Sequence, residues 1–105
     1  MFNQSTVIKI IKAYLEEVKQ AGLQIKSAIL FGSYAQNRQR EASDIDLALV
    51  ADDFVSLPIL DKNRFRFLHI RREYSLIEAH TFNTLDFEKS NAFIDEIKRT
   101  GVVIL

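Results

Sequence analysis

The sequence predicts a single domain of the α+β class, with a mixed sheet of three to four strands and helices packed on one face. A long stretch with helical spacing opens the chain, and short apolar stretches then alternate with further helical ones. The 105 residues include one Pro and no linker rich in Ser or Gly. Residues 1–105 are therefore expected to form one unit.

The first predicted element is an amphipathic helix over residues 5–21. Apolar side chains recur there every three to four positions, with Lys and Glu between them. Asn3 or Ser5 can cap its start, because a side-chain oxygen at that position accepts from the free backbone N–H groups. Gly22 suits the left-handed backbone that ends many helices.

Strands and helices alternate along the rest of the chain. The predicted strands are residues 25–31, 44–51 and 75–82, with residues 102–105 as a short final strand or a packed tail. The predicted helices are residues 33–39, 60–72 and 90–100, where 60–72 is assigned to a helix rather than a strand on its length. Residues 44–51 are apolar on both faces beyond their acids, which predicts a central strand.

Composition narrows the class of function. The absence of Cys excludes disulfides, thiolate zinc sites and a Cys nucleophile. Neither a signal peptide nor an apolar stretch of membrane-spanning length is present, so a cytoplasmic location is expected, with no membrane partner. The formal net charge is zero, from 14 basic and 14 acidic residues. Direct nucleic-acid binding is therefore not expected, since it usually requires a basic protein.

Two carboxylates stand at the start of the strand predicted over residues 44–51. Asp44 and Asp46 are two residues apart, so in a strand their side chains point to the same face. Two like charges so close repel each other unless a cation lies between them. Magnesium prefers oxygen ligands and often combines one or two carboxylates with substrate phosphates. The pair therefore predicts a magnesium site, and a chance pair at a strand end is the alternative.

A glycine turn precedes this pair. Gly32 allows a sharp turn and a close approach of the backbone to a phosphate. Ser33 adds a hydroxyl at the start of a predicted helix, whose free N–H groups favour an anion. The alternative is an ordinary strand-to-helix turn that Ser33 caps.

A third acid, Glu78, lies within the apolar stretch predicted as the strand over residues 75–82. With Ile77 and Ala79 in the core, Glu78 falls on the other face together with His80. A carboxylate on a buried sheet is costly without a partner. A metal would offset that cost, and Glu78 would then be a metal ligand or the base that deprotonates the attacking hydroxyl. A salt bridge to one of the arginines is the alternative.

These stretches together resemble a known family. Gly32-Ser33-Tyr34-Ala35, followed by Ser43-Asp44-Ile45-Asp46-Leu47, resembles the signature of the DNA polymerase β-like nucleotidyltransferases, and most closely that of the minimal nucleotidyltransferases (MNT proteins). Residues 77–82 and 94–101 also resemble this family. The resemblance implies a nucleotidyltransferase-like fold and the transfer of a nucleoside monophosphate from a triphosphate such as ATP.

The resemblance also implies roles for single residues. Asp44 and Asp46 would hold two Mg²⁺ ions, and Glu78 would be a third ligand or the base. Gly32 and Ser33 would bind the β- and γ-phosphates. The two-metal arrangement stabilises both the attacking and the leaving oxygen.

The acceptor is expected on a separate protein, because 105 residues leave no room for the helical acceptor-binding domain of larger relatives. MNT proteins are often antitoxins paired with a HEPN toxin, typically an RNase, and some add AMP to a tyrosine of that toxin. The alternatives are an antitoxin that neutralises by binding alone, and a transferase that acts on a small molecule or an RNA end. The eight Phe residues are also compatible with a homo-oligomer.

Three positions depart from the family pattern. Asn37 stands where a glycine is common, and Asn tolerates a left-handed backbone better than most residues. Gln36 stands where Arg is frequent, and Arg38 is the nearest replacement for its phosphate contact. Glu78 replaces the Asp of many relatives, and its longer arm still reaches a metal.

Overall fold

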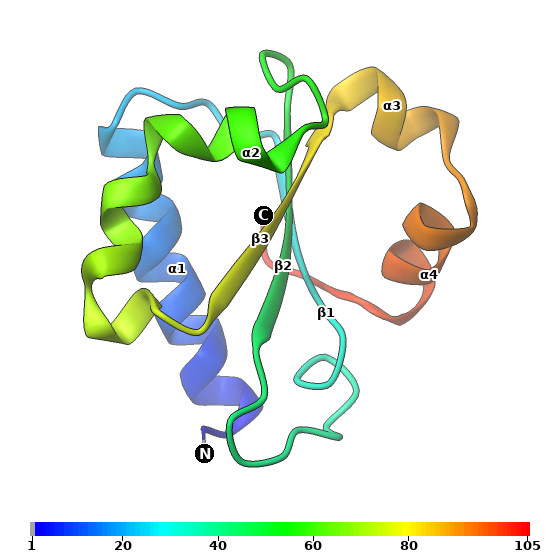
Figure 1. Ribbon diagram of the computed structural model, residues 1–105. Coiled ribbons are helices and arrows are strands. Elements are labelled where there is room, and N and C mark those ends of the chain that lie inside the picture. The colour runs from blue at the N-terminus through cyan, green and yellow to red at the C-terminus, as the bar shows by residue number, and fades with distance from the viewer. Residues whose placement is uncertain (1) are drawn as a thin grey trace.

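The computed structural model describes residues 2–105 and contains a four-stranded mixed sheet (Figure 1). The strands are β1 (Ser27–Phe31), β2 (Ile45–Ala51), β3 (Ile77–Asn83) and β4 (Val102–Val103). They lie in the order β3-β2-β1-β4, with β1 antiparallel to β2 and β4 and with β2 parallel to β3. The α+β class and the mixed sheet are confirmed, and β2 is an inner strand as predicted.

Helices lie on both faces of this sheet (Figure 1). They are α1 (Gln4–Gln20), α2 (Pro58–Asp61), α3 (Thr84–Lys89) and α4 (Ala92–Thr100), together with 3-10 turns at Lys62–Arg64, Arg66–Ile70 and Arg72–Tyr74. One face carries α1 and residues 58–74, as predicted, but α3 and α4 lie on the other. The second face needs a cover of its own, because it carries an apolar cluster in which Ile94 and Ile97 pack on Ile29, Ala48 and Val50. Over residues 2–105, no helix has the length and apolar character needed to cross a bilayer.

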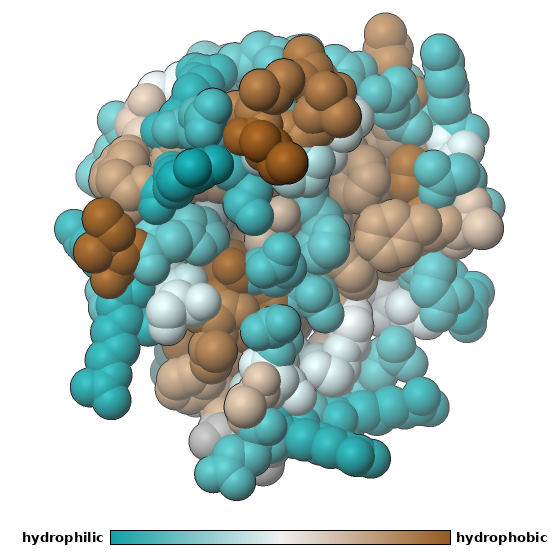
Figure 2. Space-filling model, viewed as in Figure 1, coloured by the Kyte–Doolittle hydropathy of each residue, from teal (hydrophilic) through white to brown (hydrophobic). Residues whose placement is uncertain are grey.

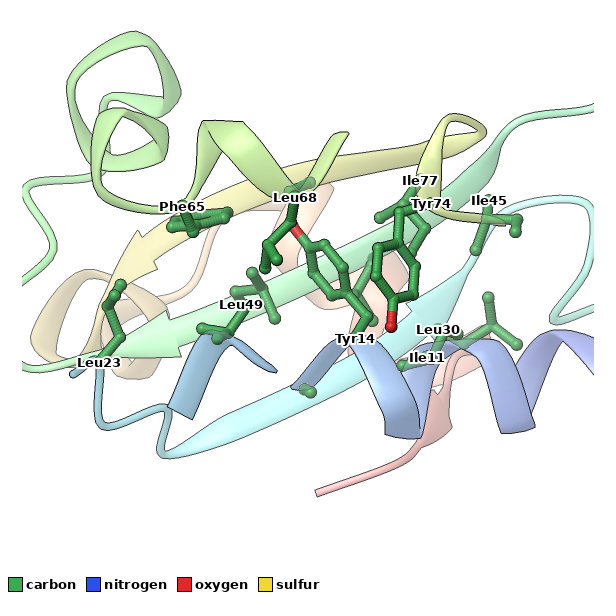
Figure 3. Packing of buried hydrophobic residues seen from close by; sticks show 14 of the residues in the cluster. Ile11, Tyr14, Leu23, Leu30, Ile45, Leu49, Phe65, Leu68, Tyr74 and Ile77 are labelled. Atoms are coloured by element: carbon green, nitrogen blue, oxygen red, sulfur yellow. The ribbon is translucent and has the colours of Figure 1, made fainter. Parts of the chain in front are cut away.

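The larger core lies between α1, the sheet and residues 58–74 (Figure 3). Asn3 caps α1 by accepting a hydrogen bond from the backbone N–H of Thr6 at 2.8 Å, and Gly22 follows the helix with a φ of 94°. The apolar stripe of α1 therefore buries Val7, Ile11, Tyr14 and Val18.

Three segments differ from their predicted secondary structure. Residues 33–37 form consecutive turns instead of a helix, and residues 38 and 39 have no regular structure. Residues 58–74 do form helical structure, but as one short α-helix followed by 3-10 turns. The third difference is α3, which was not predicted, although Asn83 caps it by accepting from the backbone N–H of Leu85 at 2.9 Å.

A partly buried polar pair joins α1 to residues 58–74. The hydroxyl of Tyr14 lies 2.8 Å from Nε2 of His69. Burial raises the pKa of Tyr14. Burial also lowers the pKa of His69, the charge of Lys62 lowers it further, and Glu78 opposes both effects. Tyr14 therefore donates its proton to a neutral His69.

This pair predicts that the protein loses stability as the pH falls. The folded pKa of His69 is below its ordinary value of 6.5, so the unfolded chain binds the proton more readily. The contribution of His69 is complete above pH 6.5 and is lost as the pH drops through 6.5 towards the folded pKa. The thermal unfolding midpoint should fall on acidification over this range, and His69→Gln should flatten the decrease. An equal decrease in both proteins would contradict the assignment.

Candidate active site

The candidate site lies where β1 ends and β2 begins, at the end of the sheet that carries the loop of residues 32–44 (Figure 1). In the sheet register Asp46 stands between Phe31 of β1 and Glu78 of β3. Asp46 and Glu78 therefore point to the same face from adjacent strands. Asp44 precedes β2 directly and is exposed. The structure thus brings the three predicted acids to one end of one sheet.

Gly32 contacts the carboxylate of Asp46. Its φ is 74°, in the left-handed region that favours glycine, and a Cβ built on it would overlap Oδ2 of Asp46. The carboxylate of Asp46 occupies the space that a side chain at position 32 would need. The turn and the carboxylate are consequently parts of one site.

The turn after Gly32 is held by its own backbone and by α1. The N–H of Gln36 donates to the carbonyl of Gly32 at 3.3 Å, and the N–H of Arg38 donates to that of Ser33 at 2.8 Å. Asn37 has a φ of 55°, so it takes the left-handed conformation that the sequence suggested for it. The turn has thus kept its shape without a glycine at that position.

Gln4 is a positioning residue that sequence reasoning missed. Its amide Nε2 donates to the carbonyl oxygens of Tyr34 and Ala35 at 2.9 and 3.2 Å. Within residues 2–105, the backbone N–H groups of Ser33 and Tyr34 donate no hydrogen bond. The turn therefore has its carbonyls fixed by protein while two of its donors remain available to an anion.

His80 stands beside Asp46. Its Nε2 lies 3.5 Å from Oδ1 of Asp46 without the geometry of a hydrogen bond. The His80 and Asp46 side chains are 31 % and 30 % exposed, so both line the edge of the site. The sequence had placed His80 on the same face as Glu78, which the strand confirms.

Glu78 is not buried, contrary to the prediction. Its side chain is 55 % exposed, and Oε1 lies 4.0 Å from Nζ of Lys62. A salt bridge to an arginine was the alternative to a metal, and the basic neighbour in the structure is instead a lysine from the 3-10 turn Lys62–Arg64. Because Glu78 is exposed, solvation offsets much of the cost of its charge.

Within residues 2–105, no three His, Asp or Glu side chains already lie together in a geometry that holds a metal ion. The roles of Asp44, Asp46 and Glu78 as metal ligands, and of Gly32 and Ser33 at the phosphates, therefore stay predictions. The geometry itself provides hard oxygen ligands next to a turn with free N–H donors. That combination suits a phosphate carrying a divalent cation.

The family follows from comparison with known proteins. Residues 9–105 match the family model described as polymerase beta, nucleotidyltransferase. The chain belongs to this family, as its Gly-Ser turn and Asp-x-Asp pair indicated.

One named relative and two solved structures are similar to this chain. The chain is 28 % identical over 101 residues to a protein named "Putative protein adenylyltransferase MJ0141" from Methanocaldococcus jannaschii, an alignment that covers 93 % of this chain and 98 % of the relative. The fold of this chain matches a crystal structure of a putative nucleotidyltransferase from Sulfolobus solfataricus with a TM-score of 0.65 and 19 % sequence identity. The match covers 95 % of this chain and 80 % of the other. A toxin-antitoxin structure with AMP-PNP also matches, with a TM-score of 0.62 and 20 % identity over 99 % and 73 % of the two chains.

Proposed function

We propose that this protein is a Mg²⁺-dependent nucleotidyltransferase that transfers AMP from ATP to a tyrosine of a partner HEPN toxin, and that it is the antitoxin of that pair. The observation that carries the proposal is the contact between Gly32 and Asp46. It joins a turn suited to phosphates to a carboxylate suited to a metal. The name of the Methanocaldococcus jannaschii relative, a putative protein adenylyltransferase, and the similarity to a toxin-antitoxin structure support the choice of a protein acceptor.

The donor set fits magnesium. Asp46 and Asp44 would hold the ions, and Glu78, on the neighbouring strand, would be the third ligand or the base. When bound, two Mg²⁺ would stabilise the charge on the attacking and leaving oxygens. Nζ of Lys62 lies 4.0 Å from Oε1 of Glu78, so Lys62 competes with a metal or a substrate proton for that carboxylate.

The turn supplies the other half of the site. Ser33 would offer its hydroxyl and its backbone N–H to the β- and γ-phosphates, and the N–H of Tyr34 would add a second donor. Gln4 holds the carbonyl side of the turn, so these donors need no rearrangement to bind an anion. The chain itself thus orients the triphosphate beside Asp46.

We expect the partner to bind at a surface away from this site. Large apolar side chains are exposed on and just before α2, where hydrophobic residues gather at the top of Figure 2. They are Val55, Leu57, Ile59 and Leu60, with exposures from 54 to 79 %. Exposed apolar patches often mark protein–protein contacts, which favours a protein partner over a small acceptor.

We expect Gly32→Ala to weaken ATP binding in the presence of Mg²⁺ by about tenfold or more, because the new methyl group displaces the Asp46 carboxylate. Gly22→Ala is the matched control. It also replaces a glycine of positive φ, but a Cβ there has nothing within 4 Å. Calorimetric titration measures both affinities. Equal ATP affinities in the two variants would contradict a role for the Gly32 contact.

The test uses the proposed partner, a HEPN protein encoded by a neighbouring gene. Its intact mass is measured after incubation with this protein, ATP and Mg²⁺. The expected result is a gain of one AMP on a tyrosine of that protein. A stable mass despite tight binding and neutralisation would favour the second candidate, an antitoxin that acts by occlusion. The position of Lys62 favours that candidate, since its ammonium group lies 4.0 Å from Oε1 of Glu78 and partly offsets the charge of the third acid.

A further inference from the structure

Aromatic side chains gather on the face of the sheet that carries Asp46. The ring centroid of Phe31 lies 5.0 Å from that of His80 and 5.7 Å from that of Phe93. The rings of His80 and Phe93 are 6.0 Å apart, and Phe82 lies behind them at 6.2 Å from Phe93. Phe31, His80 and Phe93, here called the aromatic shelf, come from β1, β3 and α4.

The shelf borders the candidate site directly. Phe31 pairs with Asp46 in the sheet register and precedes Gly32 in the chain. His80 places Nε2 3.5 Å from Asp46 Oδ1. A nucleotide held by its phosphates at the Gly32 turn and by a metal at Asp46 would therefore have its base within reach of these rings.

Phe93 is the exposed member of the shelf. Phe31 is 9 % exposed, whereas Phe93 is 47 % exposed at the start of α4. The helix is already anchored to the sheet by Ile94 and Ile97, which are buried. A single exposed Phe is ordinary on a protein surface. Phe93 differs because other rings fix its orientation while the residue stays partly exposed beside His80, which itself lies next to Asp46.

We infer that the aromatic shelf is the stacking subsite for the base of the nucleoside triphosphate, with Phe93 as the ring that contacts the base. This inference rests on the proposed function. A flat base is the ligand that best covers an open aromatic face, and such stacking contributes substantially to nucleotide affinity. The acceptor tyrosine of the partner is another aromatic group that could contact the same surface. The experiments below distinguish it from the base.

The absence of tryptophan from the chain allows a direct test. Phe93→Trp introduces one indole at the shelf, and Leu85→Trp introduces one at an exposed position of α3, beyond the far end of β3. Each variant is titrated with ATP and with inorganic tripolyphosphate in the presence of Mg²⁺. The expected result is that ATP changes the fluorescence of Phe93→Trp, that tripolyphosphate does not, and that Leu85→Trp responds to neither.

Phe93→Ala provides the second measurement. We expect its ATP affinity, measured by calorimetry, to fall about tenfold while its tripolyphosphate affinity stays unchanged. Equal ATP affinity in wild type and Phe93→Ala, together with a silent Phe93→Trp, would overturn the inference. Loss of transfer to the partner with ATP affinity retained would assign the shelf to the acceptor and would also overturn it. Failure of wild type to bind either ligand would instead contradict the proposed function.

Discussion

Replacing Asp44 and Asp46 together by alanine is expected to lower AMP transfer to the partner protein by roughly 10³-fold or more. In the proposed function the two carboxylates would hold the metal, and Asp46 also lies against Gly32. The time course of the partner's intact mass measures the loss. Binding to the partner should persist, because the exposed apolar residues around α2 are untouched.

The matched control is Asp52→Ala/Asp53→Ala. Asp52 and Asp53 come directly after the other end of β2. There Asp52 pairs with Lys26, and Asp53 pairs with Arg64. The control should keep transfer at a rate close to that of the wild type. Equal losses in the two double variants would show that charge or stability, and not the position of Asp44 and Asp46, determines the rate.

Asp61→Ala is expected to lower the free energy of unfolding by about 3 kcal/mol, the largest loss of stability predicted for a single acid. Asp61 is 6 % exposed, and its carboxylate accepts three hydrogen bonds. The donors are the N–H groups of Val55 and Leu57, at 3.0 and 3.1 Å, and the Thr81 hydroxyl at 2.7 Å. Alanine leaves these groups without an acceptor and frees α2 from β3.

Urea unfolding measures this effect, and Asp53→Ala is the reference. Asp53 forms a 2.6 Å ion pair with Arg64, but both side chains are about half exposed, so its loss should cost under about 1 kcal/mol. Similar costs for the two variants would contradict the structural role of Asp61.

Local patterns predicted the features that depend on neighbours in sequence. The alternation of side chains along a strand placed Glu78 on the same face as His80, and the sheet register of the structure then sets Glu78 beside Asp46. The tolerance of Asn for a left-handed backbone explained Asn37, whose φ is 55°. The signature residues led to the right family, which the match over residues 9–105 shows.

Long-range contacts determined what the sequence did not reveal. Gln4 reaches the turn across 30 residues, and Lys62 reaches Glu78 from a separate 3-10 turn. Neither partner is visible from spacing alone. The exposure of Glu78 likewise depends on which segments pack near it in the fold, so a carboxylate in an apolar stretch was wrongly expected to be buried.

One missed element did have a local signal. Asn83 precedes α3 and caps it, and Asn91 caps α4 by accepting from the N–H of Ile94 at 2.8 Å. Two such caps eight positions apart indicate two short helices. Phe87 lies on the first of these helices and packs into the apolar cluster on the second face of the sheet. An apolar residue at this position therefore indicates that α3 covers that face.

We propose above all that this protein transfers a nucleotidyl group and not a terminal phosphate. The most direct measurement uses ATP labelled at the α-phosphorus and, separately, at the γ-phosphorus, with the partner protein and Mg²⁺ present. Nucleotidyl transfer breaks the bond between the α-phosphorus and the bridging oxygen, so the α label should appear on the partner and the γ label only in pyrophosphate. Appearance of the γ label on the partner, or of neither label on it, would contradict the account.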